Sequence, residues 1–295
     1  MFQFFANIFG FLLNTINNIV NNYGLAIILF TVLIKLIMLP LSIKQQKTMK
    51  KNVKLQEKMK VLQFKYKNDP EKLNKEMMDL YKQEKMNPFS GCLSAIMQFI
   101  LLISIFYMVR FPLTYMQKID KNQINTYIEQ MKQDNISVSE AYSEIDIVRE
   151  LNYLKDKFPE NNELNKINLN MNFFGLDLSK IPQQNLSDWT VYIIPVLYII
   201  STFISMKITT NMQNNTKSDK KAIDITEDGK QVEEKDEKSE MEEAMAQSNK
   251  MMSWMMPIMS ISISLVAPLG LALYWLVNNL LMIVERLILN KFIKD

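Results

Sequence analysis

The fold of this chain follows from one stretch, YGLAIILFTVLIKLIMLPLSIKQQK, residues Tyr23–Lys47. Residues 23–41 are apolar apart from Thr31 and Lys35, and this length suffices for a helix that crosses a lipid bilayer. A dense run of lysines follows Pro40 directly. Because a charge inside a membrane span is costly and usually faces protein or water, Lys35 is the first candidate for a functional site.

The composition points to a membrane protein and away from several enzyme classes. The 295-residue chain gathers its apolar residues into about five long runs, and charged residues fill the gaps between them. It has no histidine and one cysteine, Cys92, which excludes an intramolecular disulfide, a Cys/His metal site and His-dependent nucleophilic catalysis. Neither GxxxxGK(S/T) nor GxGxxG occurs. We therefore expect no metal, no cofactor and no enzymatic activity.

The distribution of charge predicts the orientation in the membrane. Residues 42–92 hold 13 lysines against 6 acidic residues, and by the positive-inside rule this segment is cytoplasmic. Residues 113–188 hold 12 acidic against 8 basic residues, which agrees with an outer location. The N-terminus is then outside and the C-terminus is cytoplasmic.

The predicted fold class is all-α: a polytopic membrane protein with five transmembrane helices, an N-terminal interfacial helix and a cytoplasmic helical hairpin. Its segments, in chain order, are an amphipathic interfacial helix (1–22), the first span (23–41), the cytoplasmic hairpin (42–92), the second span (93–112), an extracellular segment (113–188), the third span (189–206), a cytoplasmic acidic loop (207–250), the fourth span (251–267), the fifth span (271–290) and a cytoplasmic tail (291–295).

Residues 1–22 form an amphipathic pattern without a single charge. Apolar residues recur at helical spacing, and asparagines lie opposite them. The segment lacks the basic region and the small-residue cleavage site of a signal peptide. We predict a helix that lies in the membrane interface; the alternative is an uncleaved, signal-anchor-like start.

The 42–92 segment predicts two facing helices. Each carries an apolar stripe at helical spacing, and between them Asp69 suits a helix cap and Pro70 the first helical position. The lysines at the base of the hairpin are placed to attract anionic lipids of the inner leaflet. Two roles stay open, a docking surface for partners and a plain tether between two spans.

The second cytoplasmic loop has a different character. Its middle, residues 217–243, consists almost entirely of charged and small polar residues. Such a composition cannot bury an apolar core, so we predict that this stretch is disordered. The sequence suggests no function for it.

Three segments together resemble one family. They are the first span from Tyr23 through KLIMLPLSIKQQ, the stretch NPFSGCL (residues 87–93) with Gln98, and LGLALYWLVNN (residues 269–279). In order and spacing they are similar to the YidC/Oxa/Alb membrane-protein insertases, of the five-span bacterial type seen in Gram-positive organisms. Lys35 stands where that family usually has arginine, and lysine, unlike arginine, can lose its charge when buried.

The resemblance implies a function and a site. It implies a hydrophilic groove, open to the cytoplasm and to lipid, in which Lys35 supplies a positive charge for an entering polypeptide. Thr31 lies one helical turn above Lys35 on the same face, and Gln98 and Trp275 join the lining by family match. The implied substrates are nascent membrane proteins, and the implied partners are the ribosome, the signal recognition machinery and the Sec translocon, with no specific nucleic acid, at the bacterial plasma membrane.

Each of these site residues also has a structural interpretation. Thr31 can bond its own helix backbone, Gln98 can join two helices, Trp275 can pack against lipid, and Lys35 can extend to the membrane surface. A different function also stays open, a small-solute transporter or channel with Lys35 as an anion site, although no inverted repeat is visible. A membrane enzyme has the least support, because no pair of base and nucleophile is present.

Overall fold

The computed structural model describes residues 2–66, 69–84, 90–218 and 258–292, and they form a mainly helical molecule. Among these residues, three helices are long and apolar enough to cross a membrane. The three stretches are Tyr23–Thr48, Trp189–Thr210 and Leu269–Lys291. They belong to α2 (Tyr23–Lys65), to η3 (Trp189–Tyr192) with α9 (Ile193–Ser218), and to α11 (Leu269–Phe292). They correspond to the first, third and fifth predicted spans.

The other two predicted spans are described only in part. Helix α4 (Ser90–Arg110) covers most of the second span, 93–112, and the apolar stretch found among its described residues is Phe99–Arg110. Residues 258–266 of the fourth span are helical, and the rest of that prediction lies outside the described residues.

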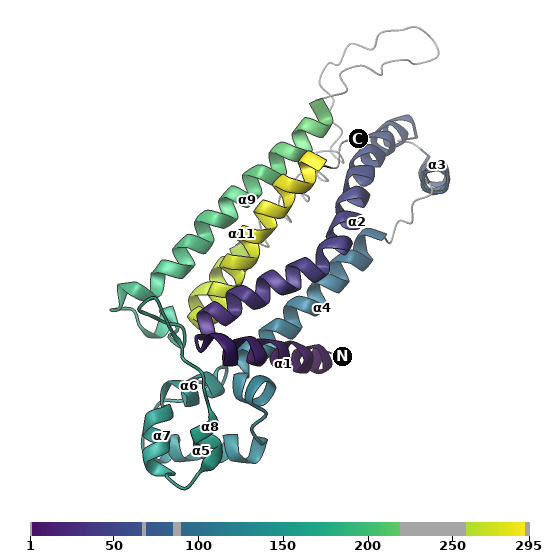
Figure 1. Cartoon of the computed structure of the whole chain (residues 1–295). Coiled ribbons are helices and arrows are strands. Elements are labelled where there is room, and N and C mark those ends of the chain that lie inside the picture. Colours follow the sequence, from purple (N-terminus) through teal and green to yellow (C-terminus); the bar gives the residue numbers. More distant parts are fainter. Residues whose placement is uncertain (1, 67–68, 85–89, 219–257, 293–295) are drawn as a thin grey trace.

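Helix α2 does not end where the apolar run ends. It continues through Pro40 for 43 residues in all, so the first arm of the hairpin is a direct extension of the membrane span. A proline inside a helix removes one backbone hydrogen bond and favours a kink. Figure 1 shows α2 changing direction part-way along its length. The predicted boundary at residue 41 is therefore not a break in secondary structure.

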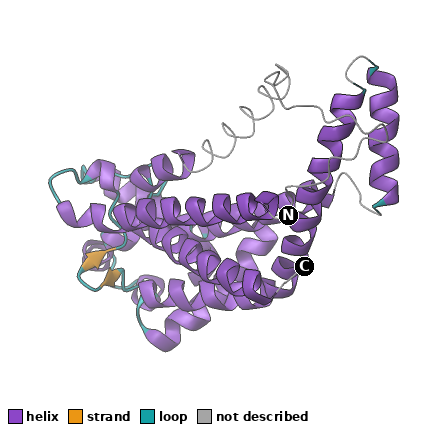
Figure 2. Ribbon diagram, turned by 90° about the horizontal axis from the view of Figure 1, so that it is seen from above, coloured by secondary structure: helices purple, strands orange, loops and turns teal. Residues whose placement is uncertain are grey.

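The second arm of the hairpin begins as predicted. Helix α3 spans Pro70–Gln83, and Asp69 accepts a hydrogen bond from the Lys72 amide at 3.0 Å. Because Pro70 has no amide hydrogen to leave unpaired, it suits the first helical position. Figure 2 shows α3 beside the end of α2, apart from the other helices.

Helix α1 (Phe2–Val20) packs against α4, α2 and the short π-helix η1 (Leu113–Gln117). Figure 1 shows it lying across α4, at a large angle to the long helices. Gly10 permits the close contact between α1 and η1, because a Cβ at this position would lie 2.3 Å from the carbonyl oxygen of Tyr115. Asn17, which the pattern placed on the polar side, is buried and donates to the Asn168 carbonyl at 2.7 Å.

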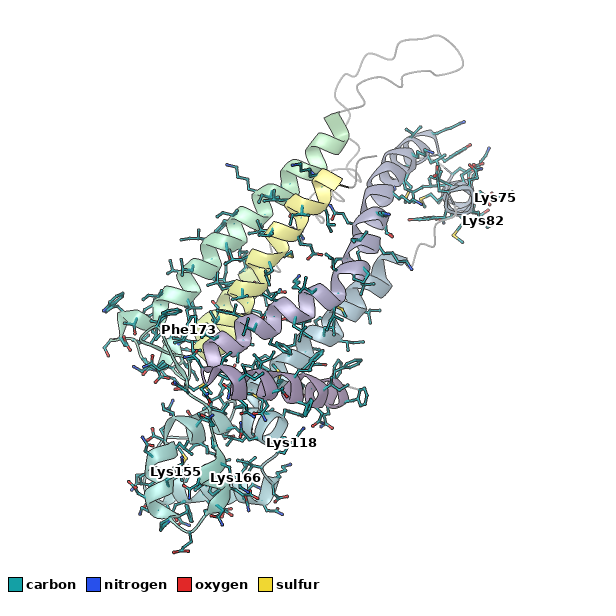
Figure 3. All side chains as sticks on the ribbon, in the orientation of Figure 1. Lys75, Lys82, Lys118, Lys155, Lys166 and Phe173 are labelled. Carbon is teal, nitrogen blue, oxygen red and sulfur yellow. The ribbon has the colours of Figure 1, made fainter. Side chains whose placement is uncertain are left out.

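Between α4 and α9 the chain forms a small helical unit, whose members are α5 (Lys121–Gln133), α6 (Ser143–Arg149), α7 (Leu151–Lys157) and α8 (Asn162–Lys166). Its core holds Ile124, Tyr127, Met131, Ile147, Leu154 and Leu164. Figure 3 labels Lys155 and Lys166 on this unit, at the opposite end of the molecule from Lys75 and Lys82 on α3.

A short stretch, residues 168–180, joins the beginnings of the long helices, and we call it the collar. It contains the antiparallel pair β1 (Asn172–Phe173) and β2 (Leu176–Asp177), and the 3-10 turn η2 (Pro182–Gln184) follows it. The collar carbonyl of Asn170 accepts from the Tyr23 amide at 3.0 Å, and that of Leu178 accepts from Gly270 at 2.9 Å. These bonds satisfy first-turn amides that a helix leaves unpaired.

The beginnings of α2, α9 and α11 therefore lie at one end of the molecule, beside the helical unit (Figure 1). Helix α9 continues to Ser218, so the first residues of the predicted loop 207–250 are helical rather than irregular. Residues 219–257, which include nearly all of the stretch predicted to be disordered, lie outside the described residues.

Candidate functional site

Lys35 has an acidic partner inside the membrane-spanning region. Its Nζ lies 3.5 Å from Oε2 of Glu285 on α11, and the two side chains are 22% and 14% exposed. Lys35 lies about 18 Å along α2 from Tyr23, and Glu285 about 24 Å along α11 from Leu269. Both positions fall within the thickness of a bilayer core, about 30 Å, in the half away from the collar.

The packing changes at the level of this ion pair. On α2, Tyr23, Ile27, Phe30 and Thr31 are buried at helical spacing, whereas no residue from 32 to 48 is. The half of α2 nearest the collar is thus packed against protein on one face, and the following stretch is only half-buried or exposed.

Helix α11 has the same asymmetry. Its residues 269–274 are all buried, whereas none of residues 280–288 is. Between these stretches Asn279 is the last buried side chain before Leu289. The Lys35–Glu285 pair therefore lies where the close packing of α2 against α11 gives way to partly accessible side chains.

Thr31, one turn above Lys35, is enclosed in the packed half. Its side chain is 1% exposed, and its Oγ1 donates to the Ile27 carbonyl at 2.6 Å. In this structure the hydroxyl thus bonds its own helix, which is the structural alternative that the sequence left open. A role in lining a groove stays a prediction.

Trp275 and Gln98 do not meet Lys35 in the described contacts. The half-buried Trp275 ring lies against Tyr198 of α9, with ring centroids 6.1 Å apart, so it packs α11 onto α9. Gln98 belongs to α4, and its side chain lies outside the described atoms. Among the three predicted site residues whose side chains the structure describes, only Lys35 and Thr31 are neighbours, on one face of one helix.

A polar ladder joins α9 to α11. Asn279 donates to Ser201 Oγ at 2.9 Å and to Thr202 Oγ1 at 3.2 Å, and all three side chains are buried. Seven residues further along both helices, Arg286 donates to Thr209. The constant offset between partners shows that α9 and α11 run parallel.

Sequence reasoning did not assign roles to this ladder or to Glu285. The available signals were the seven-residue spacing of polar residues in two apolar runs and the two adjacent charges, Glu285 and Arg286, inside the fifth predicted span. An ionisable residue within a span marks a functional or structural contact.

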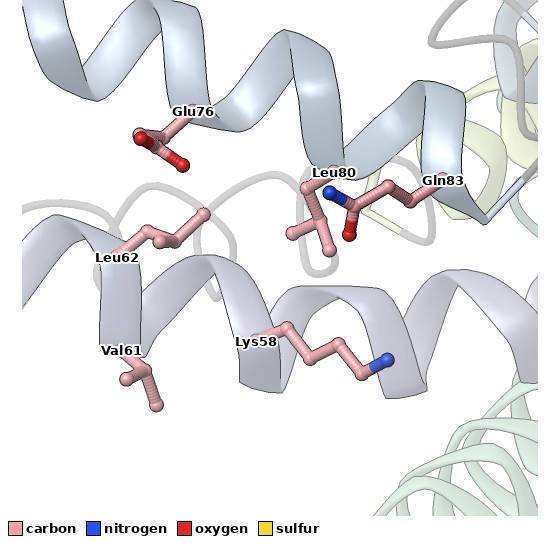
Figure 4. Close-up of a pocket in the computed structure, with 6 residues that line it drawn as sticks. All are labelled: Lys58, Val61, Leu62, Glu76, Leu80 and Gln83. Carbon is pink, nitrogen blue, oxygen red and sulfur yellow. The ribbon is translucent and has the colours of Figure 1, made fainter. Parts of the chain in front are cut away.

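The hairpin carries a separate pocket between α2 and α3, with a volume of about 250 Å³. Its lining mixes apolar walls with charges of both signs and consists of Lys58, Val61, Leu62, Glu76, Leu80 and Gln83 (Figure 4). Lys58 also pairs with Glu84 at the end of α3. This ion pair is exposed and holds the two arms together with little net stabilisation.

Comparison with known proteins identifies the family. The model of the family described as 60Kd inner membrane protein matches residues 15–295. A stretch of 109 residues, 37% of this chain, is 48% identical to proteins named "Membrane protein insertase YidC" from Francisella tularensis subsp. novicida (strain U112) and subsp. holarctica (strain LVS). The matched stretch spans 20% of the length of those relatives. The chain belongs to the 60Kd inner membrane protein family, which is the YidC/Oxa1 family that its three sequence segments predicted.

Proposed function

We propose that this protein is a membrane protein insertase: a non-enzymatic catalyst that moves nascent transmembrane segments from the cytoplasm into the bilayer. The observation that carries the proposal is the Lys35–Glu285 pair at the level where α2 and α11 cease to pack closely. The family match and the names of the relatives support it.

The physical task explains the arrangement. A polar segment that crosses hydrocarbon loses its hydrogen bonds to water, which costs several kcal/mol for each unsatisfied group. A polar site that reaches from the cytoplasm to mid-bilayer shortens this crossing. The packed half of α2 and α11, which the collar joins at its far end, closes the path beyond Lys35.

The protein is a multi-pass bacterial membrane protein, and we propose the plasma membrane, with the N-terminus outside and the C-terminus in the cytoplasm. In this orientation the helical unit and the collar lie outside, and α3 lies in the cytoplasm (Figure 3). We propose five spans, the two beyond the three described being α4 and a helix over 251–267 that contains the described residues 258–266.

The exposed face of α1 supports an interfacial position for that helix. Phe4, Phe11 and Ile19 are largely exposed on α1, while Phe9 and Leu13 are buried against the protein. Exposed aromatic and aliphatic side chains on a helix that lies across the spans suit contact with lipid.

The hairpin is the proposed meeting point with soluble partners. Its lysines suit anionic lipids at the base, and the pocket between α2 and α3 suits a polypeptide such as a ribosome-bound chain or part of the signal recognition machinery or the Sec translocon. The alternative function, an anion transporter with Lys35 as its site, has weaker support because no inverted repeat is visible in the sequence.

Reconstitution tests the proposal directly. Purified protein in liposomes is supplied with a single-span substrate made in a cell-free system, and protease protection measures insertion. We expect more protected substrate than in liposomes without the protein, and we expect the gene to restore growth of a bacterium depleted of its own insertase. Anion flux without substrate protection, from protein that unfolds cooperatively, would overturn the proposal in favour of transport.

A further inference from the structure

We propose that Glu285 is a resident substitute for the carboxylate of a substrate. In the absence of a substrate, Glu285 is paired with Lys35, and an acidic side chain of the entering segment takes its place. The strength of the Lys35–Glu285 pair thereby determines how strongly the site selects acidic segments. This inference rests on the proposed insertase function and names a specificity-determining residue for it.

No other acidic residue of the described membrane-spanning helices is available to pair with Lys35. Glu285 is the only acidic residue in 23–48, 90–110, 189–218 and 258–292, which hold α4, the described part of the fourth predicted span and the three candidate spans. A carboxylate in a span is costly unless it is paired. Its placement opposite Lys35 therefore neutralises the charge of Lys35.

The ion pair between Lys35 and Glu285 has a long N–O separation. The separation of 3.5 Å is longer than the usual 2.7 to 2.9 Å of a charge-assisted hydrogen bond. Two other ion pairs of this protein are tighter: Lys180–Asp188 at 2.8 Å and Arg149–Asp146 at 2.7 Å. A single long contact is easier to exchange for another carboxylate than a short or bidentate one.

The ion pair is accessible to a carboxylate of an entering segment. Both side chains retain accessible surface, and neither residues 32–48 of α2 nor residues 280–288 of α11 are buried. An incoming carboxylate reaches Lys35 without unpacking the buried contacts of Phe30 and Thr31. Exchange therefore needs a rearrangement of two side chains and leaves the helix packing in place.

The exchange predicts a specific selectivity. A segment with a neutral tail gains nothing at Lys35 while Glu285 remains there, and a segment with an acidic tail gains only the difference between its own carboxylate and that of Glu285. Removal of the Glu285 charge exposes Lys35 fully. The preference for acidic tails then rises, although the protein has lost a polar group.

The test compares two substrates that differ only in their tails, one with aspartates and one with asparagines. The measured quantity is the ratio of their insertion in liposomes, together with the ratio of their binding affinities for the full chain in nanodiscs. We expect Glu285→Gln to raise both ratios at least about fivefold, a typical size for coupling between sites. Lys35→Gln combined with Glu285→Gln is expected to bring both ratios to about one, because the cation that attracts acidic tails is gone, while Arg286 keeps its hydrogen bond to Thr209 of α9.

Two further variants keep the result decisive. Glu285→Asp shortens the side chain, lengthens the contact with Lys35 and is expected to raise the ratios part-way, even where Glu285→Gln folds poorly. Glu129→Gln makes the same change at an exposed position of α5, outside the hairpin and the proposed site, and is expected to leave the ratios at the parental value.

The inference is overturned if folded Glu285→Gln and Glu285→Asp proteins both keep the parental ratios, or if Glu285→Gln raises them equally in the Lys35→Gln background. The proposed function fails separately. If the parent inserts neither substrate, insertion is refuted, while the binding ratios still report whether Glu285 competes for Lys35.

Discussion

Asn279 donates a hydrogen bond to Ser201 at 2.9 Å and so ties α11 to α9 within two otherwise apolar stretches. A second polar contact between the same helices, Arg286 to Thr209, lies seven residues further along α11 and eight further along α9. Helix α2 meets α11 differently, through apolar packing near the collar and one long ion pair beyond it. We therefore expect α9 and α11 to stay together when a substrate enters, and α2 to be the helix that moves relative to them.

Asn279→Leu tests the ladder. Ser201 and Thr202 keep their bonds to the Tyr198 carbonyl, so the loss is limited to the bonds between helices. Such bonds contribute about 0.6 kcal/mol on average and up to about 1.7 kcal/mol in membrane proteins. We expect a loss of that size in unfolding experiments in bicelles. The neighbouring Asn278→Leu is the control, and equal losses from both variants would contradict the ladder.

Gly24→Ala tests the attachment of the collar. A Cβ on Gly24 would lie 2.3 Å from the Phe173 ring, which Figure 3 places near the start of α2. Overpacking of this kind costs about 1 to 3 kcal/mol. We expect a lower unfolding temperature and faster proteolysis of the 113–188 segment.

The partner substitution makes that prediction sharper. Phe173→Ala removes the ring atoms that would lie 2.3 and 2.4 Å from that Cβ and leaves the Cβ of residue 173 at 2.8 Å. The clash is therefore partly relieved, and the double variant Gly24→Ala/Phe173→Ala is expected to be more stable than the sum of the two single changes implies. Strict additivity would show that the two residues do not press on each other.

Asp188 predicts a dependence on pH at the start of the third span. A hydrogen bond from Lys180, followed by bonds from Thr190, lowers the pKa of Asp188 from 3.8 to about 2. Because the pKa is lower in the folded protein, the carboxylate stabilises the fold above pH 3.8, and this contribution is lost as the pH falls towards 2.

We therefore expect the stability of the parent to fall between pH 4 and 2 more steeply than that of Asp188→Asn, in thermal unfolding followed by circular dichroism. Asp156→Asn, at an exposed carboxylate of α7, is the control and is expected to keep the parental slope. If Asp188→Asn also keeps the parental slope, the interactions with Lys180 and Thr190 do not stabilise the charged carboxylate.

Lys35 variants must be interpreted together with Glu285. Lys35→Gln leaves the Glu285 carboxylate without its cation, and breaking a fully buried pair in this way costs about 3 to 5 kcal/mol. The cost here is smaller, because both side chains are partly exposed. Lys35→Glu places two carboxylates together, and Lys35→Arg keeps the charge and is expected to be tolerated.

A double-mutant cycle measures this coupling. We expect Lys35→Gln/Glu285→Gln to be more stable than Lys35→Gln alone, with an interaction energy of about 0.5 to 3 kcal/mol in bicelle unfolding. An interaction energy of zero would show that the two charges do not sense each other in the membrane.

Cys92 tests the orientation. It belongs to α4 next to the lysine-rich hairpin, so we expect a membrane-impermeant maleimide not to label it in intact cells. A cysteine introduced at the exposed Lys166 of the helical unit, in a Cys92→Ser background, is expected to react from outside (Figure 3). Labelling of Cys92 from outside would contradict the proposed orientation of the protein in the membrane.

Local signals in the sequence predicted local structure well. Asp69 and Pro70 predicted the start of α3, and the apolar run from Tyr23 predicted a membrane span, because capping and hydropathy depend on neighbours in sequence. The first span was predicted to end at residue 41, yet α2 continues through Pro40 to Lys65, since a long helix tolerates one missing hydrogen bond at a bend.

The site itself was only half visible in the sequence. Lys35 stood out as a charge in an apolar run, whereas Glu285 lies near the C-terminal end of its predicted span, beside Arg286, where charges are ordinary. Their contact joins residues 250 positions apart and depends on α2 and α11 starting at the same end. The hydrogen bonds of the collar also join segments far apart in the sequence, and they are made by backbone atoms. No side-chain pattern could therefore predict them.

The collar has a bearing on cellular energetics. A protein that admits polar polypeptide from one face of an energised membrane must not become a conduit for protons or sodium ions. The collar carbonyls accept hydrogen bonds from the first turns of both α2 and α11. In the orientation proposed above these are the outer ends of the two helices, so we propose that the same bonds hold the helices together and close the path on that side. We expect damage to residues 168–180 to appear first as a loss of membrane potential, before any loss of inserted protein.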